Sequence, residues 1–384
     1  MERKLERKRK ALDEHRKEVK KALSEQEKVG KSNSWTWTIF KFLVISILVL
    51  TILNYSSLKQ EYAKLRPEDG KLHDIGFGHN LFIYCQGHGK PVVVLDAPAG
   101  ETFDTWTLIQ REVAKHTKVC SYDRSGLGFS DRSYRNASAL NQANSSVVHG
   151  TEKMVDDLRR LLSTAKVSLK PLIYVGAEMG AINGRYYSSL NFPEVAHLVL
   201  VNPLTENFLS INERVWELFW YSHLVPSIQK AQLLSAIGFT RVGYKLYLRK
   251  DALEDENVDE MVKLRHKYLS CSPGHQSTKL EEYLLLNASL IRLKNFLLHE
   301  PIPDTMPVTV IASDQFDRNI SSELNQVWQN LITELTDKIH PQSRRVKIAD
   351  GDRKDIYYKG APTISKVIIQ AIKQYRKSRV MKST

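Results

Sequence analysis

The sequence predicts an α/β protein with a mostly parallel sheet, a helical insertion and one membrane-spanning helix before the folded part. Three observations support this prediction. Short apolar runs alternate with helix-length segments, as is typical of parallel strands joined by crossover helices. Between the fifth and sixth run, residues 205–304 have helical rather than strand character. A nearly unbroken apolar stretch lies close to the amino terminus.

Length and composition favour one large folded domain with appendages. The chain has 384 residues, 42% of them hydrophobic, which allows a sizeable core. The net charge of +13 is unevenly placed, because residues 1–33 hold twelve Lys or Arg and seven Asp or Glu. We expect no nucleic-acid partner and no cofactor. The cysteines Cys85, Cys120 and Cys271 form no CxxC pair, so the sequence supports neither a zinc site nor a disulfide framework.

Residues 35–55 are predicted to span a membrane. About 20 residues cross the hydrocarbon core, and this stretch suffices if Lys41 extends its amine to the headgroups. Basic residues before the stretch outnumber those after it, which predicts a cytosolic amino terminus and a lumenal or extracellular main domain. A buried core helix is the alternative. Four sequons give candidate glycosylation sites at Asn136, Asn144, Asn287 and Asn319.

The chain is expected to divide into five parts. Residues 1–34 are predicted to form a basic cytosolic helical arm, which together with the span contacts membrane lipids or holds a partner helix. A juxtamembrane linker follows at 56–70, the α/β core occupies 71–204 and 305–384, and a helical cap lies at 205–304. Strands are expected at Leu81–Cys85, Val92–Leu95, Lys118–Tyr122, Leu172–Val175, His197–Val201, Val308–Ile311 and Arg344–Ile348.

Several separated blocks resemble the α/β-hydrolase superfamily over about residues 71–375. The run Pro91–Gly100 is similar to the family's third strand and oxyanion loop. The run Tyr122–Asp131 is similar to its Tyr-Asp-x-x-Gly-x-Gly-x-Ser block, the most specific of the set. The resemblance implies an α/β-hydrolase fold, with a mostly parallel sheet of the eight-stranded type and a helical cap.

The nucleophile position implied by this resemblance is Glu178 rather than a serine. Gly176 and Gly180 flank it as glycines flank the serine of a Gly-x-Ser-x-Gly turn. A glutamate forms no useful acyl-enzyme, and it adds a methylene where the reach of the nucleophile matters. We expect its carboxylate to accept the following N–H at the helix amino terminus and partly to plug the site.

The other catalytic positions implied by the resemblance also depart from a hydrolase. The histidine position is Asp355, and the acid position is Asp314, with Asp317 as a near alternative. One oxyanion donor falls on Pro98, which has no N–H, and the other on Met179. A shift of one residue in the alignment would place the first donor at Ala97 or Ala99. Loss of the nucleophile or the base lowers turnover by about 10⁴ to 10⁶. The resemblance therefore implies an inactive hydrolase.

These features predict a membrane-anchored pseudohydrolase that binds a small apolar ligand or a protein partner. Candidate ligand-binding residues are Glu178, Asp355, Trp216 and Trp220, although the tryptophans also fit packing between cap and sheet. One alternative is a divergent hydrolase of an ester or lipid-like substrate, in which Glu178 and Asp355 form an acid/base or cation-chelating carboxylate pair. No other metal-ligand spacing is found. Another alternative is a membrane-tethered scaffold that acts through its basic arm.

Overall fold

The computed structural model describes residues 2–133, 150–167, 170–210, 215–248, 257–348 and 351–383. The chain forms two compact units, Met1–Ser56 and Ser57–Thr384. The first unit consists of the amino-terminal part of one long helix. The second unit contains the sheet, the helices around it and the cap.

Helix α1 runs without a break from Glu2 to Leu65. In the described part of the chain, one helix is long and apolar enough to cross a membrane, over Trp35–Leu65 with a mean hydropathy of 2.2. The predicted linker at 56–70 is therefore helical through Leu65. Within the second unit, the last turns of α1 are fixed by Tyr62 and Leu65, which pack into an aromatic cluster with Phe129.

The sheet has eight strands in the order β1-β2-β4-β3-β5-β6-β7-β8. Strand β2 is antiparallel to β1 and β4, and the remaining neighbours are parallel, which confirms the mostly parallel sheet. The strands are β1 (Lys71–Asp74), β2 (Asn80–Gln86), β3 (Val92–Asp96), β4 (Val119–Tyr122), β5 (Leu172–Ala177), β6 (Val195–Val201), β7 (Val308–Ser313) and β8 (Arg344–Ile348). The sequence pattern missed β1, because this edge strand is short, polar and partly exposed.

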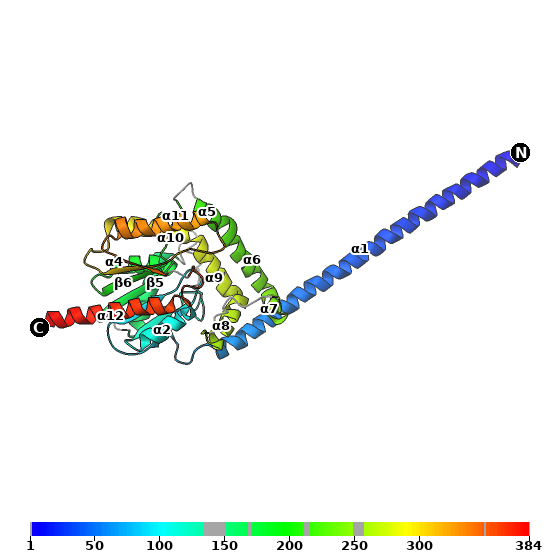
Figure 1. Ribbon diagram of the computed structural model, residues 1–384. Helices are drawn as coiled ribbons and strands as arrows, with labels where there is room; N and C mark the ends of the chain where they lie inside the picture. Colours follow the sequence, from blue (N-terminus) through cyan, green and yellow to red (C-terminus); the bar gives the residue numbers. More distant parts are fainter. Residues whose placement is uncertain are drawn as a thin grey trace. The chain divides into compact units, whose positions relative to one another are not determined.

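Helices cover both faces of the sheet, as Figure 1 shows. Val93 and Leu95 of β3 pack towards α2 and α12, whereas Val92 and Val94 pack towards the helices of the opposite layer. Successive strand residues point to opposite faces, so a strand buried on both sides is a continuous apolar run. The helices of the two layers are α2 (Thr107–Ala114), α3 (Thr151–Thr164), α4 (Met179–Leu190), α11 (Ser322–Glu334) and α12 (Ala361–Ser383).

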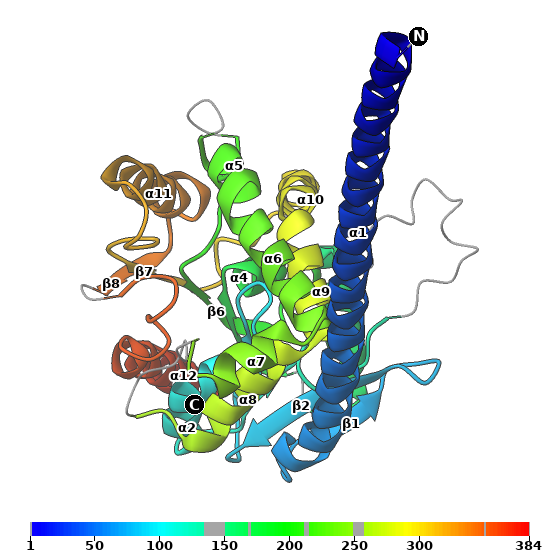
Figure 2. The same ribbon diagram turned by 90° about the vertical axis from the view of Figure 1, so that its right-hand side faces the viewer.

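The described residues of the predicted cap form helices joined by turns and contain no strand (Figure 2). Helix α10 packs against α3 and α4 of the core, whereas α9 packs against α6 within the cap. The cap helices are α5 (Val215–Phe219), a π-helical turn (Trp220–Leu224), α6 (Val225–Ala236), α7 (Phe239–Lys245), α8 (Glu260–Cys271), α9 (Pro273–Leu284) and α10 (Leu286–His299).

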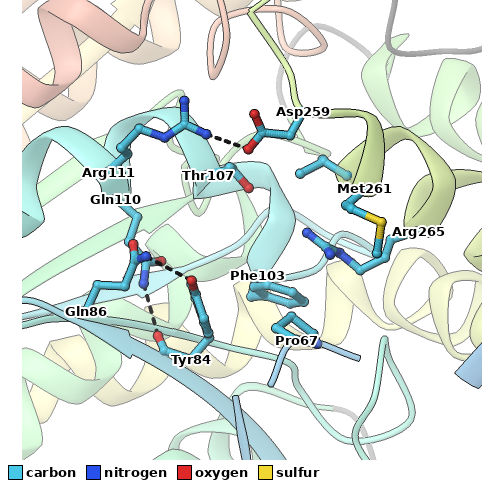
Figure 3. Close-up of a pocket in the computed structure, with 11 residues that line it drawn as sticks. Pro67, Tyr84, Gln86, Phe103, Thr107, Gln110, Arg111, Asp259, Met261 and Arg265 are labelled. Carbon is cyan, nitrogen blue, oxygen red and sulfur yellow. Dashed lines mark hydrogen bonds and ion pairs between the residues drawn. The ribbon is translucent and has the colours of Figure 1, made fainter. Parts of the chain in front are cut away.

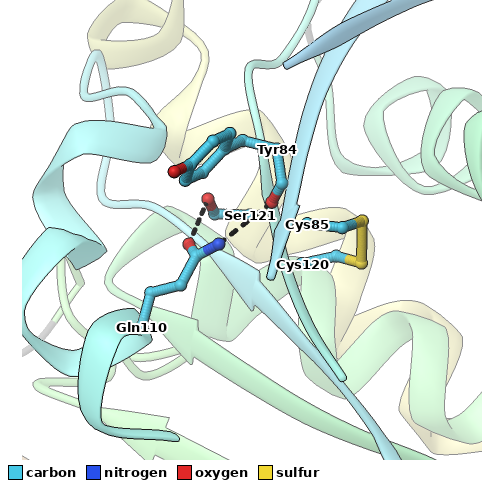
Figure 4. Close-up of a disulfide and its surroundings, with 5 residues drawn as sticks. All are labelled: Tyr84, Cys85, Gln110, Cys120 and Ser121. Carbon is cyan, nitrogen blue, oxygen red and sulfur yellow. Dashed lines mark hydrogen bonds between the residues drawn. A yellow bond between two sulfur atoms is a disulfide. The ribbon is translucent and has the colours of Figure 1, made fainter. Parts of the chain in front are cut away.

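Cys85 of β2 and Cys120 of β4 form a disulfide (Figure 4). This finding corrects the expectation that the cysteines support no disulfide. The two residues are 35 positions apart in the sequence, but the antiparallel register places them directly opposite each other. Gln110 of α2 bridges the same two strands through side-chain hydrogen bonds. The pairing depends on sheet register, which cysteine spacing does not reveal.

Candidate functional site

Glu178 lies in a sharp turn between β5 and α4. Its φ of 44° and ψ of −103° are rare for a residue other than glycine. A Cβ on Gly176 would meet the carbonyl oxygen of Gly180 at 2.1 Å, and one on Gly180 would meet the carbonyl oxygen of Asp96 at 2.3 Å. The turn forms here because glycine alone fits at both flanking positions.

The Glu178 side chain is fully buried and faces Arg353, whose Nε lies 3.4 Å from Oε1. Neither carboxylate oxygen has a hydrogen-bond partner among the described protein atoms. The expected hydrogen bond from Met179 N–H is therefore wrong, because the carboxylate points to Arg353 rather than back to its own helix. Burial raises the pKa of Glu178, and the Arg353 charge acts against this shift.

Aromatic rings and a hydroxyl hold Arg353 in place. Its guanidinium lies 5.1 Å from the centre of the Phe316 ring and 5.8 Å from that of Tyr283, and Nη2 donates to the Tyr283 hydroxyl. Burial disfavours the charge of Arg353, but Glu178 and Tyr283 outweigh it and raise the pKa of the guanidinium. Arg353 therefore remains the charged counter-ion of Glu178.

Asp355 does not join Glu178. It pairs with Lys359 at 2.8 Å and with Arg318 at 3.5 Å, and it accepts the Asp352 N–H. Burial would raise the pKa of Asp355, but its bond with Lys359 and the backbone bond from Asp352 outweigh this effect and lower the pKa. The two carboxylates therefore do not form the pair considered from the sequence.

Sequence reasoning missed Arg353 as the partner of Glu178. The resemblance places the histidine position seven residues before Pro362, at Asp355. A count along the chain does not show which side chain of the loop turns inward. The available signal was a cation two residues before Asp355. A carboxylate buried at the turn requires such a counter-ion.

The two candidate acids follow β7. Asp317 is buried and pairs with Lys354 at 2.8 Å. Burial would raise the pKa of Asp317, but Lys354 outweighs this and lowers it. The carbonyl of Asp314 accepts from Gln329, which fixes the end of the strand. In this protein the acid loop is therefore bound to the loop of Arg353 by an acid–lysine pair.

A cavity of about 500 Å³ lies beneath the cap and reaches Glu178 and Arg353. Ile228 of α6 and Leu269 of α8 are among its apolar lining residues, and Pro98 of the loop after β3 also lines it. A volume of this size is typical of small-ligand sites. The cavity brings together Glu178 and Pro98 of the predicted site and adds Arg353.

Arg124 fixes the loop after β3 that contains Pro98. It is buried and donates to Asp96 at 2.7 Å and to both carboxylate oxygens of Glu282 on α9 at 2.7 and 2.8 Å. It also donates to the Pro98 carbonyl at 2.7 Å. Pro98 thus presents its carbonyl to Arg124 and has no N–H to offer the cavity. Met179, the other implied donor, is the buried first residue of α4.

A family profile described as the alpha/beta hydrolase fold matches residues 60–251. The chain belongs to the α/β-hydrolase fold family. This result agrees with the strand order, the turn at Glu178 and the cap. A comparison with curated proteins finds no match.

Solved structures share the fold of this α/β-hydrolase family member. The Cif epoxide hydrolase from Acinetobacter nosocomialis is 15% identical, with 82% of this chain and 96% of that chain covered and a TM-score of 0.58. An epoxide hydrolase from Vigna radiata is 16% identical, covers 80% and 99%, and has a TM-score of 0.58. A carboxylesterase structure from Nitrososphaera gargenis is 14% identical, covers 80% and 100%, and has a TM-score of 0.54. Identities this low show the fold alone.

Trp216 and Trp220 are fully buried and are not among the residues that line the cavity. The Trp216 ring lies 4.9 Å from that of Phe316. The Trp220 ring stacks on Tyr283 at 4.9 Å, and its Nε1 donates to the Tyr283 carbonyl. Trp216 therefore packs the cap against the loop after β7, and Trp220 packs within the cap. Their expected ligand contacts have no support in this geometry.

The cap contributes two histidines, His266 and His275, to the α/β-hydrolase cavity. Sequence reasoning missed them because it sought a base only near the last strand. His275 Nδ1 accepts the Gly128 N–H at 3.3 Å, so the neutral ring carries its proton on Nε2. Burial, with a smaller effect of Lys279, lowers the pKa of His275 to about 3.

Replacing His275 with glutamine should reduce the acid sensitivity of folding. The pKa of His275 is about 3 in the folded chain and near 6.5 when unfolded. Its contribution to stability is therefore complete above pH 6.5 and is lost as the pH falls towards 3. The slope of unfolding free energy against pH, measured by urea denaturation between pH 6 and 4, should decrease by about 1.4 kcal/mol per pH unit. An unchanged slope would contradict the assigned burial.

A second, smaller pocket of about 250 Å³ lies between α8, α2 and the sheet edge (Figure 3). Arg111 and Asp259 form an ion pair across its rim. Arg265, which lines this pocket, binds Asp104, which lines the main cavity, through buried bonds of 2.7 to 3.0 Å. This ion pair and Val262 form the wall between the two spaces.

The predicted sequons fall in different settings. Asn319 is exposed in the loop after β7, where its side chain donates to Asp317. Asn287 lies in the first turn of α10 and is partly buried, with Ser289 of the same sequon fully covered. Asn136 and Asn144 lie outside the described residues. Asn319 is the more accessible of the two described sites.

Proposed function

We propose that this protein is a membrane-anchored, non-catalytic member of the α/β-hydrolase fold family that binds a small ligand beneath its cap. The single observation that carries the proposal is the Glu178–Arg353 ion pair. It occupies the turn where relatives present a nucleophile and the loop where they present a histidine. A buried, ion-paired carboxylate and an arginine do not perform serine-type acyl transfer.

The oxyanion loop gives independent support. Oxyanion stabilisation needs N–H groups aimed at the developing negative charge, and loss of one donor costs about 10² to 10³ in turnover. Pro98 has no N–H, and its carbonyl is bonded to Arg124. The negative charge of Glu178 would further oppose an oxyanion beside it. Each of these features alone disfavours hydrolysis.

The geometry also supports binding. The cavity beneath the cap has a volume of about 500 Å³ and combines apolar walls with a polar floor. The buried Arg124 network joins the oxyanion loop to α9 of the cap. This network keeps the cavity formed without substrate, which favours a pre-organised binding site.

Anchoring by residues 35–55, with the folded unit in the lumen or outside the cell, is part of the proposal. The apolar helix Trp35–Leu65 and the basic residues before it support this orientation. The Cys85–Cys120 disulfide supports an oxidising compartment. An exposed sequon at Asn319 is compatible with it.

Treatment of the full-length protein with a fluorophosphonate probe and a panel of esters tests the absence of catalysis. We expect no labelling and no turnover by the natural sequence. A Glu178→Ser, Arg353→His double variant introduces a nucleophile and a base at the two facing positions, and we expect it to be labelled at the introduced serine. Glu178→Ser alone is the matched control without a base. Active-site labelling or ester turnover by the natural sequence would refute the proposal.

A further inference from the structure

Two polar groups in the cavity lining are buried and have no hydrogen-bond partner among the described protein atoms. They are the Glu178 carboxylate, which is fully buried, and the hydroxyl of Tyr357, whose side chain is 3% exposed. Both groups line the same cavity beneath the cap. A buried polar group without a partner is costly, and it marks a position where another molecule completes the bonding.

The hydrogen-bonding character of this site is opposite to that of a site that binds esters. An ester-binding site presents N–H donors to a carbonyl oxygen. Here Pro98 presents no donor, and Glu178 adds two acceptor oxygens at the position of the nucleophile. A ligand that donates a hydrogen bond satisfies Glu178, whereas an ester has acceptors only.

The charges that line the cavity are paired. Glu178 faces Arg353, Glu101 binds Lys279 at 2.7 Å, and Asp104 binds Arg265. The fourth pair is Lys354 with Asp317. An ionic ligand would add an uncompensated charge to this balanced set, which is costly in a buried site. The arrangement therefore favours an uncharged polar end group.

The apolar walls and the volume of the cavity indicate the chemistry and size of the rest of the ligand. Ile228, Val262 and Leu269 line the space on the cap side, and the volume is about 500 Å³. An apolar body of moderate size gains most from burial against such side chains.

From this geometry we infer that the cavity binds an uncharged amphiphile whose polar end is an alcohol or a primary amide. Its O–H or N–H donates to Glu178, and its oxygen accepts from the Tyr357 hydroxyl. The inference rests on the proposed binding function, and it identifies the ligand class of the same site. Esters of equal size should bind to this cavity with lower affinity.

Matched aromatic probes test this ligand class. Benzamide, benzyl alcohol and methyl benzoate are similar in size, but methyl benzoate has no hydrogen-bond donor. We expect calorimetric titration of the full-length protein in phospholipid nanodiscs to show benzamide and benzyl alcohol binding at least about ten-fold more tightly than methyl benzoate. Empty nanodiscs correct for partitioning into lipid. Equal or tighter binding of the ester, or no binding of benzamide up to its solubility, would overturn the inference.

A Glu178→Gln variant provides the second part of the binding experiment. A glutamine side chain both donates and accepts, so it can bond to the ester carbonyl, and the preference for benzamide should fall to less than about three-fold. Glu112→Gln makes the same change at a residue that pairs with Lys115 outside the cavity lining, and it should keep the preference. Thermal unfolding confirms that each variant is folded. A preference that persists in Glu178→Gln would show that Glu178 does not select the ligand.

The experiment separates this inference from the proposed function. Turnover of methyl benzoate to benzoate by the natural sequence would refute the non-catalytic proposal, whatever the order of affinities. No turnover together with no preference for donors would refute the ligand class alone.

Discussion

An Arg124→Met variant is expected to lose most of the stability of the folded domain. Arg124 neutralises the buried carboxylates of Asp96 and Glu282 and donates to two backbone carbonyls. Removing one member of a buried ion pair typically costs about 3 to 5 kcal/mol, and here two carboxylates lose their partner. We therefore expect a loss of about 5 kcal/mol or more, which is comparable with the whole stability of many domains. Urea denaturation followed by tryptophan fluorescence measures it.

Two further variants show whether the geometry of the guanidinium matters. Arg124→Lys keeps the charge but cannot serve Asp96 and Glu282 at the same time, so only part of the stability should return. Arg132→Met removes a partly exposed pair with Glu281, the neighbour of Glu282, and should cost about 1 kcal/mol or less. Equal effects of Arg124→Met and Arg132→Met would contradict the assigned role of the buried network.

An Arg353→Met variant is expected to be the next most destabilising change. It leaves the fully buried Glu178 carboxylate without its counter-ion, at a cost of about 3 to 5 kcal/mol near neutral pH. Adding Glu178→Gln should restore much of this loss, because the uncharged side chain needs no cation. Urea denaturation of the single and double variants measures the coupling.

The pH dependence of Arg353→Met has a definite sign. Burial already raises the pKa of Glu178, and removal of the opposing Arg353 charge raises it further. A carboxyl group whose folded pKa is raised contributes stability below its unfolded pKa and loses it as the pH rises through the folded value. The variant should therefore lose less stability at pH 5 than at pH 8. Lys354→Met, which breaks a more exposed pair with Asp317, is the matched control.

The sequence predicted the core of the fold because its signals are local. Strands such as β3 and β5 are buried on both faces, so they read as continuous apolar runs bounded by turns. The helical cap and the turn at Glu178 were also accessible, since helix-length segments and paired glycines act within a few residues. Edge strand β1 was missed because its polar residues carry no such signal.

The candidate site was predicted in part. Glu178 was recognised because Gly176 and Gly180 fix the position of the turn, and Pro98 was proposed from its spacing after Asp96. Arg353 was not, because it lies between β8 and α12, far from Glu178 along the chain, and only the tertiary structure brings the two together. Asp355 shows the same limit of sequence-based prediction. Its position along the chain gave no information about its ion pairs with Lys359 and Arg318.

By itself, the sequence determined the order of strands and helices along the chain, the loss of a serine at the turn and the apolar stretch at 35–55. Only the tertiary structure decided the Glu178–Arg353 pair, the Cys85–Cys120 disulfide and the cavity beneath the cap. The physical reason is distance along the chain. Periodicity and turn chemistry act over a few residues, whereas ion pairs, disulfides and cavities form between segments that only sheet register and helix packing bring together.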